Sequence, residues 1–423
     1  MSYPRMFRVK QIFDTPAPLQ DIRAAVRQAM RSLDLTSRIR IGDTVAVTVG
    51  SRGIANISVI TKSLIDELTR IGGAPFIVPA MGSHGGATAE GQLEVLKHLG
   101  ITKQSMGVPI RSSMKVVQVG ELFGHPIYLD KIAAGADHIA VLARIKPHTD
   151  FKAEIESGFH KMMLIGLGKR KGASLIHRLF AKYGYYRVLQ QGGREILKNA
   201  KIAFGIGLVE NAYDQTAKIV GALPNKMEHT EKILLRLAKA WMMKLPFDKI
   251  DILIVDQMGK NISGAGMDPN VIGRFPQPFT QSFNTKIHKL VVLSLTDESC
   301  GNAVGIGRAD LTTKKLVQKI DKRATRTNAL TALVPALAET PPCFDTDKET
   351  IAAALDSILK TKPSAKVIRI KDTLQLGEID VSEAYLPLLK KRKNLLKFGE
   401  LKPFHFNSHG NLMPFRFRKI HSH

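Results

Sequence analysis

The chain has 423 residues, 44% of them hydrophobic, which is enough to form two domains of ordinary size. Charged residues make up 23% of the chain, so the composition excludes an intrinsically disordered protein. With only two cysteines, Cys300 and Cys343, the sequence excludes a disulfide framework and indicates a reducing compartment.

The net charge of +25 suits a nucleic acid, a membrane surface or a small anionic substrate equally well. Apart from KKRK at 390–393, the basic residues are spread along the chain, so we expect them to form solvated surface. We find no apolar run of signal-peptide or membrane-spanning length. The sequence therefore predicts a cytoplasmic protein with no membrane partner.

The first predicted elements form two successive strand–helix units. Residues 44–50 predict a strand and 57–71 a helix, and residues 74–80 predict a second strand. A helix over 89–99 follows, with Thr88 as its N-cap. Two such units in succession predict a parallel sheet covered by helices.

Further along the chain, residues 138–145 predict a third strand. A glycine-rich segment at 158–180 runs into a helix, and a strand at 201–211 and a helix at 230–243 follow. Pro246 breaks this last helix, so we place the boundary between a domain of residues 1–245 and a domain of residues 246–423.

The second predicted domain opens with a strand at 251–256 and a glycine-rich loop, QMGKNISGAGMD. Its other predicted elements are a strand at 290–295, a helix at 327–339, a strand at 366–370, a helix at 383–391 and an irregular tail. The predicted fold class is α/β, with two α/β domains, parallel-type sheets and an active site in the cleft between them. The tail, with Phe404, Phe406, Phe415 and Phe417 among basic residues, either covers the core or contacts a neighbouring subunit in a homo-oligomer.

Polar residues follow three of the predicted strands. Ser51 and Arg52 follow the first, His84 lies in GSHGG after the second, and His148 lies in KPHTDF after the third. Ligands of open parallel sheets bind beyond the carboxyl ends of the strands, where these loops converge. Neutral imidazole is both a general base and a metal ligand, so His84 and His148 are candidate catalytic residues; a solvated loop histidine is the alternative.

The segment FHKMMLIG places Lys161 among apolar residues, a setting that favours a reactive amine. A snorkelling lysine is the alternative, and the neighbouring His160 stays unassigned. GLGKRKGAS at 166–174 is irregular both as a P-loop and as a dinucleotide fingerprint. In the second domain Gln257 and Lys260 follow a strand, so with Arg52 they are candidates to bind a carboxylate.

Several separated motifs together resemble the nickel-pincer lactate racemase family. VGSRG at 49–53, MGSHGG at 81–86 and KPHTDF resemble its three loops, and SGFHKMMLIG resembles its cofactor-binding segment. His177 stands sixteen residues after Lys161, where the family has its nickel-binding histidine, and DQMGK at 256–260 is similar to the family's paired glutamine and lysine.

The resemblance implies a nickel-pincer nucleotide, a pyridinium-3,5-bisthiocarboxylic acid mononucleotide, linked to Lys161 with His177 as the nickel ligand. It implies substrate binding by Arg52, Gln257 and Lys260. Hydride would pass reversibly from C2 of a 2-hydroxy acid to the pyridinium ring, while His84 or His148 takes the hydroxyl proton. Cofactor-synthesis proteins are implied as partners, since other proteins must make the nucleotide.

Three features depart from the family pattern. Val49 stands where the lactate racemases have an aspartate, and Asp256 stands where they have a tyrosine. The interval from His148 to Lys161 is about three residues longer. These changes fall in the cofactor-side loop and the substrate pocket, so we expect a racemase or epimerase of another 2-hydroxy acid, larger or more polar than lactate. Asp256 is available to pair with a substrate hydroxyl or a cation.

Two other classes stay open. A nicotinamide-dependent dehydrogenase needs a regular glycine fingerprint followed by an acidic residue, which the chain lacks, and a zinc enzyme would use the same histidines. A nucleic-acid-binding protein would fit the charge alone, but the sequence has no known nucleic-acid module and only 6% aromatic residues. We therefore expect no nucleic-acid partner.

Overall fold

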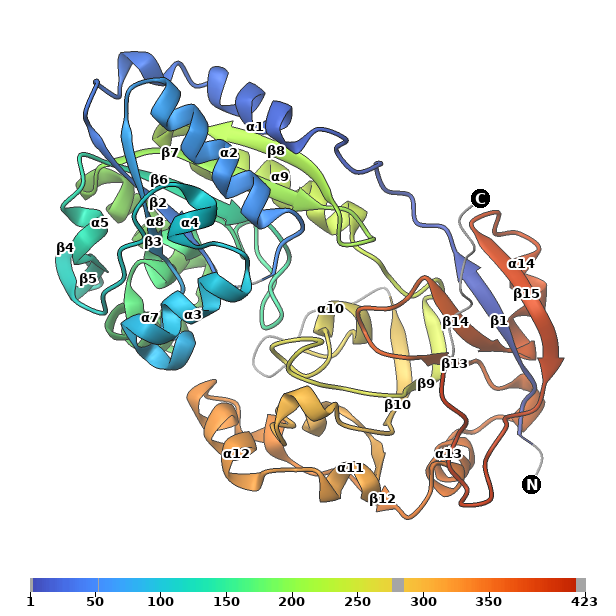
Figure 1. The fold of residues 1–423 in the computed structure, drawn as a ribbon. Coiled ribbons are helices and arrows are strands. Elements are labelled where there is room, and N and C mark those ends of the chain that lie inside the picture. Colours follow the sequence, from blue (N-terminus) through green and yellow to red (C-terminus); the bar gives the residue numbers. More distant parts are fainter. Residues whose placement is uncertain (1–2, 52, 276–284, 416–423) are drawn as a thin grey trace. The chain divides into compact units, whose positions relative to one another are not determined.

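The computed structural model describes residues 3–51, 53–275 and 285–415, which form two compact units (Figure 1). The N-terminal unit is Thr15–Met242, and the C-terminal unit combines Met1–Asp14 with Met243–His423. The predicted boundary at 245/246 lies close to this division, but the first fourteen residues belong to the other unit. Strand β1 (Met6–Gln11) pairs there with strands far along the chain, which a local pattern does not reveal.

The N-terminal unit is built on a five-stranded sheet in the order β3-β2-β6-β7-β8. The first four strands are parallel and β8 is antiparallel to β7. The strands are β2 (Thr44–Val49), β3 (Ala74–Pro79), β6 (His138–Arg144), β7 (Ile202–Glu210) and β8 (Thr216–Ala222). Four of them confirm the predicted strands, and β4 (Val116–Leu122) with β5 (His125–Asp130) forms a separate hairpin.

Helices cover both faces of this sheet, because alternate residues of each strand belong to different cores. Val45 and Val47 pack with residues of α1 and α2, whereas Ala46 and Val78 belong to the core that includes α7, α8 and α9. The helices are α1 (Ile22–Arg31), α2 (Ile57–Arg70), α3 (Ala89–His98), α4 (Lys103–Met106), α5 (Lys131–Ala134), α6 (Phe159–Lys161), α7 (Lys169–Tyr183), α8 (Tyr185–Asn199) and α9 (Met227–Trp241).

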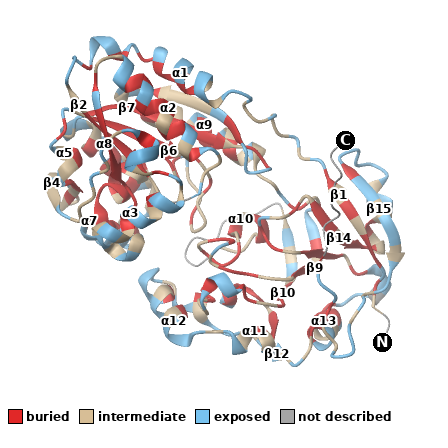
Figure 2. Cartoon of the chain, in the orientation of Figure 1, coloured by how far each residue is buried: buried red, intermediate tan, exposed pale blue. Residues whose placement is uncertain are grey.

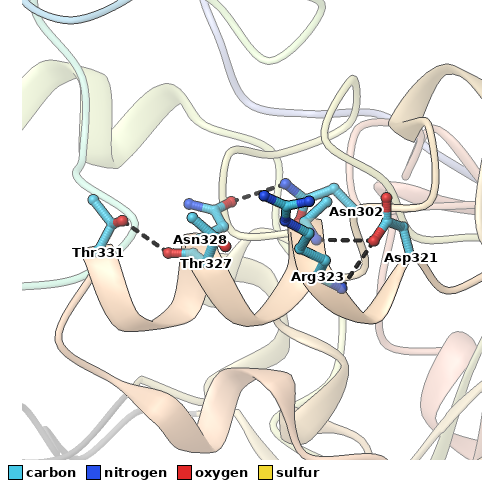
Figure 3. A pocket seen from close by; sticks show the side chains of 7 residues that line it. Asn302, Asp321, Arg323, Thr327, Asn328 and Thr331 are labelled. Atoms are coloured by element: carbon cyan, nitrogen blue, oxygen red, sulfur yellow. Dashed lines mark hydrogen bonds between the residues drawn. The ribbon is translucent and has the colours of Figure 1, made fainter.

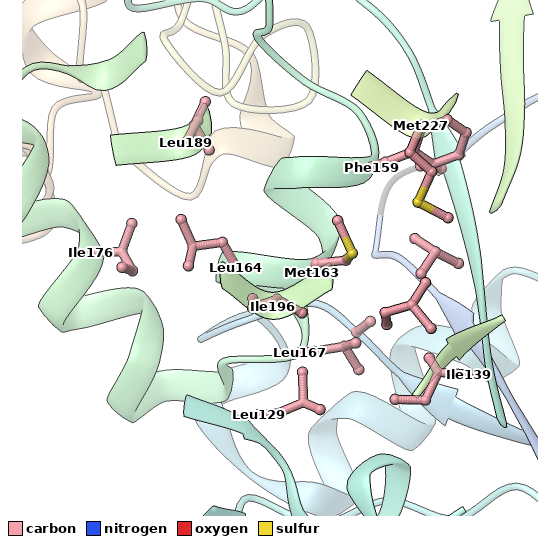
Figure 4. Packing of buried hydrophobic residues seen from close by; sticks show 14 of the residues in the cluster. Leu129, Ile139, Phe159, Met163, Leu164, Leu167, Ile176, Leu189, Ile196 and Met227 are labelled. Atoms are coloured by element: carbon pink, nitrogen blue, oxygen red, sulfur yellow. The ribbon is translucent and has the colours of Figure 1, made fainter. Parts of the chain in front are cut away.

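A π-helical turn, Met162–Gly166, connects α6 to the start of α7. Its buried side chains Met163 and Leu164, together with Leu167, pack among the hydrophobic residues of the second core (Figure 4). Single-turn π-helices are rare and occur frequently at functional sites. The packing therefore fixes the backbone of the segment that carries Lys161.

The C-terminal unit contains an eight-stranded sheet in the order β12-β11-β10-β9-β13-β14-β1-β15. The strands from β12 to β13 are parallel, and the other three pair antiparallel. Besides β1 they are β9 (Lys249–Val255), β10 (Lys286–Val292), β11 (Leu311–Thr313), β12 (Cys343–Phe344), β13 (Val367–Ile370), β14 (Glu378–Ser382) and β15 (Leu395–Lys402). Its helices are α10 (Pro269–Ile272), α11 (Lys314–Gln318), α12 (Lys322–Thr331), α13 (Asp347–Asp356) and α14 (Leu386–Leu389). Buried residues concentrate on the central strands (Figure 2).

The parallel-type α/β fold class is confirmed for both units, but two predicted segments of the second half, the helix at 327–339 and the irregular tail, are wrong. The helix at 327–339 begins earlier, at Asp321 as N-cap, and stops at Thr331 because Leu333 adopts a left-handed φ of 58° and Pro335 starts a separate turn. The predicted helix at 383–391 is confirmed as a 3-10 turn, Glu383–Tyr385, that continues into α14, Leu386–Leu389. The tail contains β15, an edge strand whose pairing partner β1 is distant in sequence.

The described part of the tail packs on the C-terminal unit. Phe404 meets Tyr3 edge-on and Phe406 lies tilted against it, with ring centroids 5.9 Å and 5.4 Å apart. Leu412 is buried in the core beside α13. Phe417 lies outside the described residues. Of the two alternatives for the tail, the structure supports coverage of the core. Within the described ranges, every helix is too short or too polar to cross a membrane.

Candidate active site

The loops after β2 and β3 meet at the carboxyl edge of the N-terminal sheet. Ser51 and His84 form a short hydrogen bond between Oγ and Nδ1, and the His84 side chain is exposed. Gly82, with a φ of 60°, donates its N–H to the carbonyl of Gly166 at 3.0 Å. This bond ties the His84 loop to the Lys161 segment. Arg52 lies outside the described residues.

The loop after β6 carries His148, and the buried carboxylate of Glu156 holds this loop. Glu156 accepts hydrogen bonds from the backbone N–H groups of His148 at 2.6 Å and Ala153 at 2.9 Å. Lys239 of α9 forms an ion pair with the same carboxylate at 2.5 Å. The position of His148 therefore depends on two side chains that the sequence motifs do not include.

The ring of His148 is set up as a neutral imidazole. Burial lowers its pKa well below the usual value of 6.5, and the charges of Lys161 and Lys146 lower it further. The N–H of Asp150 donates to Nδ1 at 3.0 Å, so Nδ1 accepts and the ring proton belongs on Nε2. In this tautomer His148 can donate a proton from Nε2, and as a neutral ring it can accept one only at Nδ1, in place of the contact with Asp150.

Lys161 ends α6, and its Nζ lies 3.4 Å from Ser157 Oγ. The start of this helix is bound by Glu231 of α9, whose Oε2 accepts the backbone N–H of His160 at 3.1 Å and contacts its Nδ1 at 2.7 Å. Both side chains are fully buried, so His160 faces the core beneath Lys161 and not the site. A side chain at Gly158 would collide with the Glu231 carboxylate.

His177 lies on α7 with part of its side chain accessible to solvent. Desolvation by the surrounding protein lowers its pKa, the charge of Lys161 lowers it further, and Asp150 opposes the shift. Lys161 also acts on His148, and so does His177. The structure thus brings His148, Lys161 and His177 together, and the Gly82–Gly166 bond places the His84 loop beside them.

An aromatic cluster, absent from the predicted site, lines this region. Tyr185 stacks on Phe151 and on Phe180 at centroid distances of 4.3 Å and 4.4 Å. His148 lies 4.5 Å from Phe151, and His177 meets Phe180 edge-on at 5.7 Å. Both imidazoles therefore border one flat apolar wall. Of the residues in this cluster, the predicted motifs included Phe151, in KPHTDF.

In the C-terminal unit, Gln257 and Lys260 lie on the loop after β9. Gln257 Nε2 donates to the buried carboxylate of Asp372 at 3.1 Å. Lys260 Nζ donates to Gly264 O at 2.6 Å and to Asn328 Oδ1 at 2.8 Å. Asn328 also accepts from Asn302 at 3.2 Å (Figure 3). These contacts give both side chains defined positions.

Asn302 and Asn328 line an open polar hollow of about 500 Å³ along α12. Arg323 and Thr327 of the same helix also line it. Lys260 reaches Asn328 at this hollow, so a ligand bound by Lys260 would meet polar groups there.

Asp256 has a charged protein partner. Its carboxylate receives two hydrogen bonds from Arg369 of β13, at 2.8 Å and 2.7 Å. Burial raises the pKa of Asp256 and the guanidinium opposes that shift. This pairing replaces the expected one with a substrate hydroxyl or a cation.

Within the residues that the structure describes, His, Cys, Asp and Glu side chains form no group of three or more suited to a metal ion. A protein-bound zinc site uses three or four such ligands. A metal held mainly by an organic group needs only one protein ligand, and His177 beside Lys161 meets that requirement.

Comparison with known proteins identifies the first part of the chain. Residues 3–184 match the family model of the lactate racemase N-terminal domain. The first part of the chain is therefore lactate racemase-like. Its fold is similar to the lactate racemase apoprotein from Thermoanaerobacterium thermosaccharolyticum, with a TM-score of 0.55 and 14% identity over 84% of this chain and 92% of that one. Comparison with curated protein sequences gives no match.

The matched range contains His84, His148, Lys161 and His177. It ends before α9, which supplies Glu231 and Lys239. Sequence motifs indicated these four residues, but not the buried carboxylates of Glu156 and Glu231. Glu156 and Glu231 have no local pattern to distinguish them, because their function depends on partners in distant segments.

Proposed function

We propose that this protein is a racemase or epimerase of a 2-hydroxy acid other than lactate, with a nickel-pincer nucleotide linked to Lys161. One observation carries the proposal. In a lactate racemase N-terminal domain, an amine and two imidazoles of lowered pKa, His148 and His177, lie within electrostatic reach of one another beside the His84 loop.

The residues present fit such a cofactor. Lys161 supplies an amine for a covalent linkage, and His177 supplies a neutral nitrogen for nickel. The wall of Phe151, Tyr185 and Phe180 offers aromatic faces to a flat ring. When bound, the nucleotide supplies a hydride acceptor, which spares the enzyme the removal of a weakly acidic proton from carbon.

The protein's own contribution is proton transfer and orientation. We assign His84 and His148 to take up and return the substrate hydroxyl proton, one for each enantiomer. Neutral imidazole can accept that proton near pH 7, and the lowered pKa of His148 keeps its ring neutral there. Gln257, Lys260 and Arg52 are proposed to bind the carboxylate.

The proposed substrate is more polar than lactate. Val49 is buried at the end of β2, so this loop presents an apolar core residue where the family's lactate racemases have an aspartate. Asp256 is paired with Arg369, and the surface next to Lys260 carries amide and hydroxyl groups. A hydroxyl or amide on the substrate could replace water at these groups.

The decisive experiment is intact-protein mass spectrometry with nickel analysis. The protein is produced together with the cofactor-synthesis proteins, as the natural chain and as Lys161→Ala. We expect a nickel-containing adduct on the natural chain and none on Lys161→Ala. Lys171→Ala is the matched control. The Lys171 ammonium lies over the ring of Tyr128 in β5, so its removal should leave the adduct unchanged.

Absence of adduct and nickel from the natural chain, in a host that loads a known racemase, would contradict the proposal. If the adduct forms, a panel of 2-hydroxy acids tested for racemisation identifies the substrate.

A further inference from the structure

Lys169, at the start of α7, is fully buried although it is a lysine. Its Nζ donates to the carbonyl of Pro79 at 2.5 Å and to Gln92 Oε1 at 3.0 Å, and it forms an ion pair with the fully buried Asp130 at 3.0 Å. Lys169 also has a left-handed φ of 51°, which is strained for a side chain with a Cβ. A buried, strained lysine of this kind persists only when surrounding contacts hold it.

The contact with Lys169 fixes the orientation of the Gln92 amide. An ammonium group has donors only, so the oxygen of Gln92 must face Lys169 and its NH₂ group must point the other way. That NH₂ group donates to the carbonyls of Gly82 at 3.0 Å and His84 at 3.4 Å. Gln92 is fully buried, so water does not compete for these bonds.

These bonds connect the buried charge to the candidate catalytic loop. Gly82, Gly85 and Gly86 all have left-handed φ values near 60°, so the loop relies on contacts from outside itself to keep its shape. A Cβ at Gly85 would lie 2.7 Å from the backbone nitrogen of Gln92, which shows how closely the loop sits on the start of α3. With the loop in this position, the Nδ1 atom of His84 forms its hydrogen bond with Ser51 Oγ.

We propose that Lys169 and Gln92 are positioning residues that hold the His84 loop, and with it the His84 imidazole, in the orientation used for proton transfer. The ammonium of Lys169 orients the Gln92 amide, and the amide binds the loop through two carbonyls. The catalytic consequence rests on the proposed function, whereas the positioning itself does not.

The test uses the full chain and two substitutions of Gln92. Gln92→Glu keeps an acceptor for Lys169 but has no donor for the loop carbonyls, and Gln92→Met removes both without adding charge. Gln11→Met is the matched control, because Gln11 is also buried and donates from Nε2 to a backbone carbonyl, that of Leu376, at 2.6 Å. The readout is the tautomer and ring nitrogen chemical shifts of His84 by NMR with labelled histidine, assigned with His84→Gln.

We expect both Gln92 variants to change the His84 ring signals and Gln11→Met to leave them unchanged. In cofactor-loaded protein, kcat should fall roughly tenfold with little change in KM, as is typical when a residue that orients an active group is lost. If Gln92→Met does not fold, Gln92→Ala, which also removes both groups without adding charge, takes its place. Unchanged signals in both variants would overturn the proposal, and so would a change in Gln92→Glu alone, which would report only the added charge.

The two proposals can fail separately. A change of the His84 signals in a protein that binds no cofactor would support the positioning and contradict the racemase function. Racemase activity together with unchanged His84 signals in both variants would support the racemase function and contradict the positioning.

Discussion

The carboxylate of Glu156 accepts the backbone N–H of His148 at 2.6 Å while it pairs with Lys239 of α9 at 2.5 Å. The pair couples a loop at the carboxyl edge of the sheet to a helix about ninety residues further along the chain. Positioning of His148 is therefore a property of the tertiary structure.

Glu156→Gln should destabilise the protein and loosen the His148 loop. The amide keeps one acceptor but places an NH₂ group against a backbone donor and leaves Lys239 without its charge partner, so we expect a loss of about 2 kcal/mol in the free energy of unfolding. Urea denaturation measures the loss, and hydrogen exchange at the His148 amide reports the loop. Glu154→Gln is the control, because it changes an exposed carboxylate of the same loop. Equal behaviour of the two variants would contradict this role of Glu156.

The depressed pKa of His148 predicts a pH dependence of stability. Below the ordinary histidine pKa of about 6.5 the unfolded chain takes up a proton at this site that the folded protein does not. Stability from this group is therefore present above pH 6.5 and is lost as the pH falls toward the folded pKa, by at most about 1.4 kcal/mol per pH unit. Urea denaturation at pH 7.5 and 5.5 should show a smaller loss for His148→Gln than for the natural chain. An equal loss would contradict the prediction, and His98→Gln on the surface of α3 serves as control.

Asp256 and Arg369 should behave as a coupled pair. Each is at most 16% exposed, so removing one partner leaves the other charge poorly solvated. We expect Asp256→Asn and Arg369→Met each to cost about 2 kcal/mol of unfolding free energy, and the double variant to cost clearly less than their sum. A double-mutant cycle by urea denaturation measures the coupling, and additive costs would contradict it.

His84 and His148 should both be required for full racemase activity. If each removes the hydroxyl proton of one enantiomer, His84→Ala and His148→Ala in cofactor-loaded protein should each lower kcat by about 10²- to 10⁴-fold. Initial rates from each pure enantiomer measure the effect, with His98→Ala as control. Full activity in both variants with normal cofactor content would show that the two-base scheme is wrong.

The origin of the hydrogen at C2 distinguishes hydride transfer from proton abstraction. Hydride returns to the same carbon without exchange with solvent, so racemisation in D₂O should leave the product without deuterium at C2. Mass spectrometry of the product after one round of turnover makes the measurement. Stoichiometric deuterium incorporation would indicate proton abstraction from carbon and contradict the proposed reaction.

The sequence by itself determined most of the N-terminal sheet and the loops that follow its strands at the carboxyl edge. β2, β3 and β6 are short runs of buried β-branched or apolar residues, and each ends in a loop with its own motif. Such features are local, so the pattern that predicts the strand also places His84 and His148 at its carboxyl end.

Only the tertiary structure decided what holds those residues and where distant strands pair. β1 joins β14 and β15 across almost the whole chain, and α12 stops at Thr331 where the apolar pattern continues. Glu156, Glu231 and Lys169 look like ordinary charged residues in the sequence. Their burial, and thus their contribution to stability, depends on partners that folding brings close. A charge stays buried only where an oppositely charged or hydrogen-bonding group pairs with it.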